Sequence, residues 1–152
     1  MSEKSTKKIA DNRKVYHDFF IEEIFECGIV LQGTEVKSLR AGKCNLKDAY
    51  ASIDNGEIWL KQMHISPYEQ GNIFNHDPIR PRKLLMHKKE INKIQSEVAE
   101  QGLTLIPTSI YFKGSHVKVA LGLAKGKKLY DKRATAAERD SKRNIERTLK
   151  GN

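Results

Sequence analysis

Few cysteines and no long hydrophobic run limit what this chain can be. Its two cysteines, Cys27 and Cys44, have no CxxC spacing and no matched histidine pair, so neither a disulfide framework nor a zinc site is indicated. We expect both thiols to be reduced and at least half-buried. No apolar stretch approaches the ~20 residues that cross a bilayer, and the start, MSEKSTKKIADNRK, lacks the apolar segment of a secretory signal. We therefore expect a soluble, cytoplasmic protein without membrane contact.

Common catalytic signatures are also missing. The five histidines show no HExxH or similar ligand spacing, and no GxSxG, P-loop or dinucleotide-binding pattern occurs. One catalytic interpretation starts from His17 and the glutamates that follow it: Glu22 and Glu26 would share one face of a strand, with Glu23 on the other. A solvated strand face is the simpler explanation. The sequence indicates no catalytic residue, no metal and no cofactor.

What the chain has in excess is positive charge. It holds 152 residues, with 28 Lys and Arg against 19 Asp and Glu and a formal net charge of +9, and this length suits one domain plus a short appendage. Such an excess favours polyanionic partners, nucleic acid first. The candidate phosphate contacts are Lys37, Arg40 and Lys43; Arg80, Arg82 and Lys83; and Lys125, Lys127 and Lys128. The alternative is that these charges only solubilise the chain.

The hydrophobic pattern predicts short antiparallel strands with two helices at their connections. Predicted strands cover residues 15–31, 46–53, 57–65, 82–86, 103–112 and 116–124. Asn55-Gly56 is a hairpin signal, and a bulge is expected near Glu22 and Glu23. The first helix covers residues 33–42, and the second has Ile91, Ile94 and Val98 as its buried stripe and ends before Gly102.

These elements predict one domain with polar ends. Residues 1–11 are expected to be flexible, residues 66–81 to form an exposed loop, and residues 12–126 to form a small closed or nearly closed β-barrel, because closure hides the edges of the sheet. Residues 127–152 form a basic tail whose few large apolar side chains cannot cover one face of a packed helix. Its i,i+4 pairs of Glu and Lys nevertheless favour a helix.

Three segments resemble one family of bacterial proteins: GTEVKSLRAGKCNLKDAY (33–50), PIRPRKLLMHKKEI (78–91) and GLAKGKKLYDKR (122–133). They are similar to the small protein B (SmpB) family, the tmRNA (SsrA)-binding proteins of trans-translation, from about Asn12 to Leu149. The resemblance implies an OB-like antiparallel β-barrel with two to three short helices and a basic C-terminal tail that is disordered when free. It also implies a non-enzymatic protein, here expected to be a monomer.

The resemblance also implies what the protein binds. Family members bind the tRNA-like domain of tmRNA and deliver it to stalled ribosomes, for ribosome rescue and peptide tagging. The tmRNA contacts would be Asn12, Glu26 and Leu85, supported by His17, Lys37, Arg40, Lys43 and Lys83. The ribosome contacts would be Lys127, Lys128, Tyr130, Asp131, Lys132 and Arg133. Tyr130 departs from the histidine that is frequent there: it keeps a ring for stacking but not an imidazole.

A coupled-folding hypothesis gives the tail a role. Arg139, Arg143 and Arg147 fall on one stripe of a helix, which would form when ribosomal RNA neutralises them in the empty mRNA channel next to the small-subunit decoding centre. Two alternatives stay open at this stage. One is a general OB-type RNA-binding factor without preference for tmRNA, and the other is an RNA-processing enzyme that uses His17 and the nearby glutamates.

Overall fold

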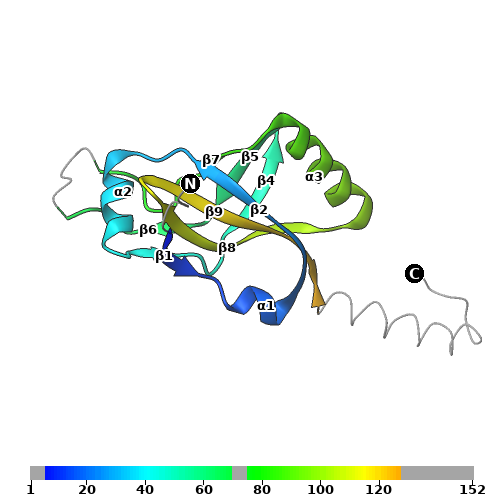
Figure 1. The fold of residues 1–152 in the computed structure, drawn as a ribbon, viewed down its shortest axis with the longest axis horizontal. Helices are drawn as coiled ribbons and strands as arrows, with labels where there is room; N and C mark the ends of the chain where they lie inside the picture. Colours follow the sequence, from blue (N-terminus) through cyan, green and yellow to red (C-terminus); the bar gives the residue numbers. More distant parts are fainter. Residues whose placement is uncertain (1–5, 70–74, 128–152) are drawn as a thin grey trace, which may run out of the picture.

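The computed structural model describes residues 6–69 and 75–127, and the expectations for the rest of the chain, including nearly all of the C-terminal tail, lie outside the described residues (Figure 1). Its main sheet has seven antiparallel strands in the order β1-β8-β4-β5-β7-β2-β9. They are β1 (Thr6–Asp11), β2 (Phe19–Ile29), β4 (Tyr50–Asp54), β5 (Glu57–Lys61), β7 (Arg82–Leu85), β8 (Thr104–Lys113) and β9 (His116–Gly126).

The sheet closes on itself. Strand β8 pairs with β9 as well as with β1 and β4, so the sheet forms a ring to which β1 is added at its edge. Two short strands, β3 (Cys44–Asn45) and β6 (His64–Ile65), pair separately. Closure leaves few unpaired strand edges in a chain of this size. The predicted fold class, mainly antiparallel β with a closing sheet and a few short helices, is confirmed.

In the described part of the chain, three helices accompany the sheet: α1 (Lys14–Asp18), α2 (Gly33–Arg40) and α3 (Lys88–Gln101). Figure 1 shows α2 and α3 at opposite ends of the ring. Helix α3 buries Ile91 and Ile94 and ends at Gly102, whose φ of 65° is left-handed, the conformation in which glycine commonly closes a helix. Both helices predicted from the sequence are therefore confirmed, and α1 is a further helix that the sequence pattern did not predict.

The hairpin between β4 and β5 follows the predicted turn chemistry. Asn55 and Gly56 have φ values of 54° and 77°, and two consecutive positive φ angles define a type I′ turn, whose twist fits the flanking strands. The register then sets Ile53 opposite Ile58 and Ala51 opposite Leu60. The hairpin prediction is confirmed, although both strands are shorter than the pattern suggested.

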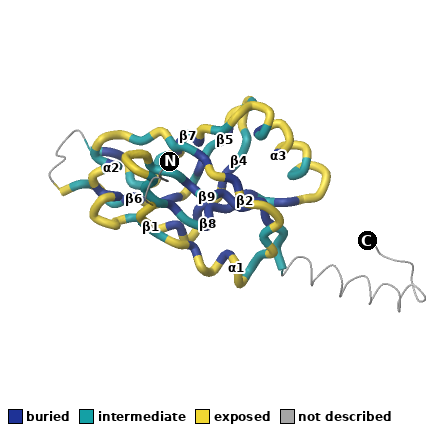
Figure 2. The backbone as a smooth tube through the Cα atoms, in the orientation of Figure 1, coloured by how far each residue is buried: buried dark blue, intermediate teal, exposed yellow. Residues whose placement is uncertain are grey.

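The core fills the ring (Figure 2). Val119, Leu121 and Leu123 are buried on β9, and Leu121 lies opposite Phe25 of β2 in the register. Cys27 is buried and Cys44 half-buried, and both thiols are free, as expected. Burial raises the pKa of Cys27 to about 12 and that of Cys44 to about 11, so neither is a reactive thiolate at neutral pH.

The beginning of the chain differs from the prediction. Thr6–Asp11 is strand β1, paired with β8, so the expectation of a flexible segment is wrong for these residues. The single strand predicted over residues 15–31 is also wrong, because α1 precedes β2. Val15 is 2% exposed, and burying it against the ring outweighs the strand propensity of this stretch. The bulge is confirmed by a register shift between Ile21 and Glu23.

The predicted loop at residues 66–81 is anchored rather than fully exposed. His76 is buried, with Nδ1 2.8 Å from the hydroxyl of Thr34 and Nε2 2.9 Å from the carbonyl oxygen of Ile65. Asn75 and Tyr68 hydrogen-bond each other across residues 70–74. Among the described residues, no helix is long and apolar enough to span a membrane.

Candidate nucleic-acid interface

Glu26 lies on the outer face of β2, in a position fixed by groups from β8. The hydroxyl of Tyr111 donates a hydrogen bond to Oε2 of Glu26, and Lys113 Nζ lies 3.1 Å from Oε1. The hydrogen bond from Tyr111, followed by the interactions with Lys113, lowers the pKa of Glu26, whereas burial and this same bond raise the pKa of Tyr111. Glu26 is thus a fixed, ionised group that can only accept hydrogen bonds.

Leu85 shares a cavity with Glu26. Gly28 and Leu85 are direct partners in the β2–β7 pairing, and a Cβ on Gly28 would lie 3.3 Å from that of Leu85. The glycine therefore makes room for the leucine, which is 51% exposed. Both residues line a cavity of about 340 Å³ together with Glu26, Met86, His87, Glu90 and Lys118. An exposed apolar side chain beside a fixed acceptor suits an unstacked base.

The cluster of Arg80, Arg82 and Lys83 does not present three free cations. Arg82 is fully buried: its Nε lies 2.6 Å from Oε2 of Glu35, and it donates to the carbonyl oxygen of Met63 at 2.6 Å. Arg80 also pairs with Glu35, at 2.6 Å. The interpretation of Arg82 as a phosphate contact is therefore wrong, because its charge is used to hold α2 against β7.

Glu35 is the carboxylate at the centre of this pair, and its side chain is 0% exposed. Burial alone would raise the pKa of Glu35, but hydrogen bonds from Arg80, the backbone N–H of Gln32 and Arg82 outweigh it, and the net pKa is lowered. The same carboxylate reaches back to Gln32 as a capping box at the start of α2. The helical pattern at 33–42 predicted α2 but not this buried charge.

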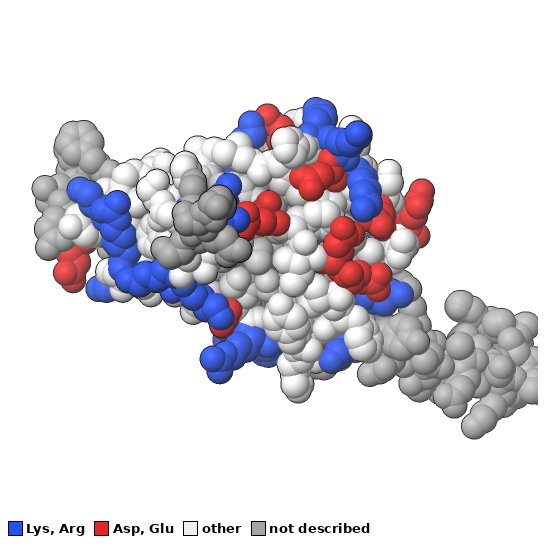
Figure 3. Space-filling view, viewed as in Figure 1, with Lys and Arg blue, Asp and Glu red and all other residues white. Residues whose placement is uncertain are grey.

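The cations of α2 and its exit remain available on the surface. Lys37, Arg40 and Lys43 are exposed, and the ammonium of Lys37 lies 5.5 Å from the centroid of the Tyr68 ring. Figure 3 shows Lys and Arg side chains forming a band over the part of the molecule that holds α2 and β1, whereas acidic and basic side chains are mixed toward α3. The continuous basic band favours a polyanion on the α2 side.

Lys83 and Leu85 alternate along β7 and so lie on one face of that strand. Lys83 Nζ pairs with Glu57 Oε2 at 2.8 Å, and its side chain is 39% exposed. An exposed pair of this kind is weak and can exchange its partner for a phosphate. Lys83, Leu85 and Glu26 therefore lie on one outer surface.

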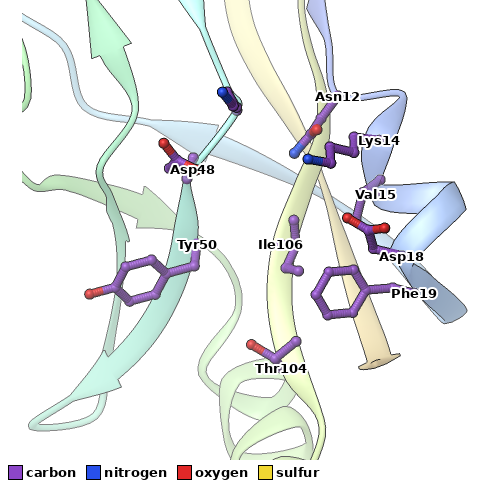
Figure 4. A pocket seen from close by; sticks show the side chains of 11 residues that line it. Asn12, Lys14, Val15, Asp18, Phe19, Asp48, Tyr50, Thr104 and Ile106 are labelled. Atoms are coloured by element: carbon purple, nitrogen blue, oxygen red, sulfur yellow. The ribbon is translucent and has the colours of Figure 1, made fainter. Parts of the chain in front are cut away.

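Asn12 lies apart from that surface. It is 7% exposed, and its amide nitrogen donates to the carbonyl oxygens of Leu46 at 3.2 Å and Pro107 at 3.3 Å. Figure 4 shows it at the edge of a cavity between α1 and the start of β4, where Lys14, Phe19, Tyr50 and Ile106 also lie. The cavity measures about 330 Å³. The contacts of Asn12 assign its amide nitrogen a structural role, which joins β1 to β8.

His17 and Lys127 mark the α1 side of the molecule. The side chain of His17 is 84% exposed and contacts Asp18 at 3.1 Å. Lys127 donates to the carbonyl oxygen of Tyr16 at 3.1 Å and lies over the Phe20 ring at 5.0 Å, so it secures the end of β9. The remaining predicted ribosome contacts lie outside the described residues: Lys128, Tyr130, Asp131, Lys132, Arg133, Arg139, Arg143 and Arg147.

The positions of Glu26 and Glu23 do not support the catalytic alternative. Glu26 lies seven residues after the first residue of β2. A strand of that length spans about 20 Å, so Glu26 is far from His17, which lies on α1 before the strand begins. Glu23 pairs instead with Lys93 of α3, at 3.7 Å. Among residues 6–69 and 75–127, no group of three or more His, Cys, Asp or Glu side chains is arranged to hold a metal ion.

The sequence patterns do not indicate three groups around Glu26: Tyr111, Lys113 and Lys118. Nothing in these patterns shows which strands lie beside one another at this place. The β8–β9 and β2–β9 registers set Tyr111 opposite Lys118 and Glu26 opposite Ala120. Contacts across three strands depend on register, which composition and periodicity do not supply.

The closed antiparallel sheet, the basic band and the Glu26–Leu85 cavity define a small, basic β-protein with a surface suited to nucleic acid. Comparison with known families is more specific. The family model described as SmpB protein matches residues 9–151, and the chain belongs to this family.

Curated relatives agree over nearly the whole chain. The SsrA-binding protein of Carboxydothermus hydrogenoformans is 61% identical over 144 residues, which is 95% of this chain and 97% of the relative. That of Acetivibrio thermocellus is 58% identical over 152 residues, with 100% and 99% covered. A solved structure described as "tmRNA-SmpB: a journey to the center of the bacterial ribosome" superimposes with a TM-score of 0.66 at 49% identity and covers 78% of this chain and 83% of that one.

Proposed function

We propose that this protein binds the tRNA-like domain of tmRNA (SsrA RNA) and delivers it to stalled ribosomes for trans-translation, acting in the cytoplasm as a binding protein and not as an enzyme. The observation that carries the proposal is the kinship with SsrA-binding proteins, at 58% identity over all 152 residues for one of them. The solved relative is likewise described with tmRNA and the bacterial ribosome.

The Glu26–Leu85 cavity is the proposed site of specific recognition. Glu26 accepts from base edges or 2′-hydroxyl groups of an unpaired loop, because a carboxylate repels phosphates and so selects against the RNA backbone. Leu85 packs against an exposed base. The low pKa of Glu26 supports this division of roles, because the carboxylate stays charged at physiological pH and cannot donate.

The cations of α2 supply the electrostatic part of binding. Lys37, Arg40 and Lys43 are exposed and project from one helix and its exit. Each phosphate that they neutralise releases condensed counterions, so this contribution to affinity falls with salt concentration. Lys83 adds a further phosphate contact once a phosphate replaces Glu57 as its partner.

Asn12 and Lys127 contribute by position as much as by contact. The amide nitrogen of Asn12 joins β1 to β8, and Lys127 secures the end of β9 against α1. The segment that follows Lys127, with Arg139, Arg143 and Arg147 at helical spacing, would meet ribosomal RNA in the empty mRNA channel. Its charge and its lack of a packed apolar face support coupled folding there.

A competition gel shift tests the proposal. Labelled tmRNA is titrated with the purified protein in the presence of excess tRNA, and we expect one specific shifted band. Equal shifts with every RNA would instead identify a general RNA-binding factor, and cleavage products would identify an RNA-processing enzyme. Either result would overturn the proposed function.

A point variant tests the assigned site. Glu26→Ala should reduce discrimination between tmRNA and generic RNA more than it reduces affinity for generic RNA. The matched control is Glu23→Ala, which removes an exposed carboxylate from the same strand outside the cavity. If both variants raise both affinities equally, Glu26 acts only as a repulsive charge.

A further inference from the structure

A third cavity lies around the tip of the β8–β9 hairpin, and of its lining residues only Arg40 already has a proposed RNA contact. It measures about 440 Å³, larger than the Glu26–Leu85 cavity, and is lined by Lys7, Arg40, Phe112, Gly114 and Ser115. These residues come from β1, the end of α2 and the hairpin tip. Its volume lies in the range of sites that hold small organic ligands.

The two cations in this cavity are uncommitted. Among the described residues, neither Lys7 nor Arg40 forms a salt bridge or a side-chain hydrogen bond, whereas the adjacent Lys8 pairs with Asp11 at 2.9 Å. Lys7 is opposite Phe112 in the β1–β8 register, and Lys8 is opposite Tyr111. Cross-strand partners point to the same face, so Lys7 and Phe112 share one face of the sheet and Lys8 and Tyr111 the other.

The hairpin tip therefore separates two different surfaces. On one face of β8, Tyr111 and Lys113 hold Glu26. On the other face, the half-buried ring of Phe112 lines the cavity with the two free cations. The basic band of Figure 3 crosses the elements that carry Lys7 and Arg40.

We propose that this cavity binds one unpaired nucleotide of RNA: the phosphate lies between Lys7 and Arg40, and the base or ribose lies against Phe112. Two cations offer charge complementarity to a phosphodiester, and an aromatic ring provides the apolar contact that unpaired bases use. The inference deepens the proposed function and rests on it. The nucleotide can belong to tmRNA or to ribosomal RNA, and the test distinguishes these two sources.

Salt-dependent binding is measured for the wild type and its variants, once with tmRNA and once with small ribosomal subunits. Lys7→Gln should reduce the magnitude of the log–log salt slope by about 0.7–0.9, which corresponds to roughly a five- to eightfold loss at 0.1 M salt. Phe112→Leu should weaken binding about fivefold without changing the slope, because it removes no charge. Lys8→Gln, a charge-matched control on the opposite face, should change neither the affinity nor the salt slope.

The nucleotide belongs to the RNA, tmRNA or ribosomal RNA, whose binding is weakened by Lys7→Gln and Phe112→Leu. If Lys7→Gln behaves like Lys8→Gln with both RNAs, the proposal is overturned. The melting curve of each variant is measured to check that it folds. Lys7→Arg, which keeps the positive charge, should have the salt slope of the wild type. A different result would overturn the proposed function: the wild-type protein would show no preference for tmRNA over tRNA. That result does not depend on the variants.

A probe that needs no large RNA gives a second readout. Amide resonances of Gly114 and Ser115 in labelled wild-type protein should shift on addition of adenosine 5′-monophosphate, and these shifts should vanish in Lys7→Gln. Equal shifts with inorganic phosphate or oligoglutamate at the same charge concentration would indicate a plain anion site and would contradict the assignment of a nucleotide.

Discussion

Replacing Glu35 with Gln is expected to destabilise the protein by about 3–5 kcal/mol, because it leaves Arg82 charged and unpaired in the interior. The carboxylate and the Arg82 side chain are both 0% exposed, and Nε of Arg82 lies 2.6 Å from Oε2. For a chain of 152 residues, each kcal/mol corresponds to about 2–4 °C in Tm. The expected loss is therefore about 6–20 °C.

The effect should depend on pH in a defined direction. The pKa of Glu35 in the folded state is lowered from its ordinary value of 4.5. The ionised Glu35 therefore contributes its full stabilisation above pH 4.5, and this contribution is lost as the pH falls through the lower pKa of the folded state. The wild type should thus lose more stability than Glu35→Gln does as the solution is acidified below pH 4.5.

Urea denaturation and thermal melting, each followed by circular dichroism, measure both effects. The matched control is Glu57→Gln, which breaks the exposed pair with Lys83, whose side chains are 47% and 39% exposed. That change should cost at most about 1 kcal/mol. If Glu35→Gln melts within a degree or two of Glu57→Gln, the buried pair does not hold α2 against β7, and the argument for its role is refuted.

Three further predictions concern the RNA-binding surfaces. Arg40→Glu with Lys43→Glu should weaken tmRNA binding sharply and reduce the salt slope by roughly 1.4–1.8, because two phosphate contacts are lost; an unchanged slope in a filter-binding titration would mean that both cations are bystanders. Tyr111→Phe should raise the pKa of Glu26 in an NMR titration, since it removes the main cause of its depression; a constant pKa would contradict this. Ala137→Pro should leave the melting curve and tmRNA gel shift unchanged but strongly reduce tagging on stalled ribosomes, because Pro costs about 3 kcal/mol only inside a helix; normal tagging would favour a purely electrostatic tail.

Local patterns predicted most of the elements. Asn55-Gly56 indicated the hairpin turn, and the stripe of Ile91 and Ile94 indicated α3. Each of these signals depends on residues close together in the chain. The specific wording of three segments indicated the family, and the family model confirmed it.

Other features depended on neighbours that are far apart in the sequence. Thr6–Asp11 becomes a strand only because β8 offers it an edge, and residues 14–18 become a helix because Val15 is buried against the ring. Local propensity is a weak guide where a partner strand or burial of one side chain decides the outcome.

The sequence by itself determined the net charge, the short strands and their turns, and the family to which the chain belongs. Only the tertiary structure decided which charges are free to bind RNA. Arg82 and Arg40 look alike in the sequence, yet one is fully buried against Glu35 and the other lines an open cavity. The physical reason is that pairing and burial of a charge depend on side chains that register and packing bring together from distant parts of the chain, here 47 residues apart for Glu35 and Arg82.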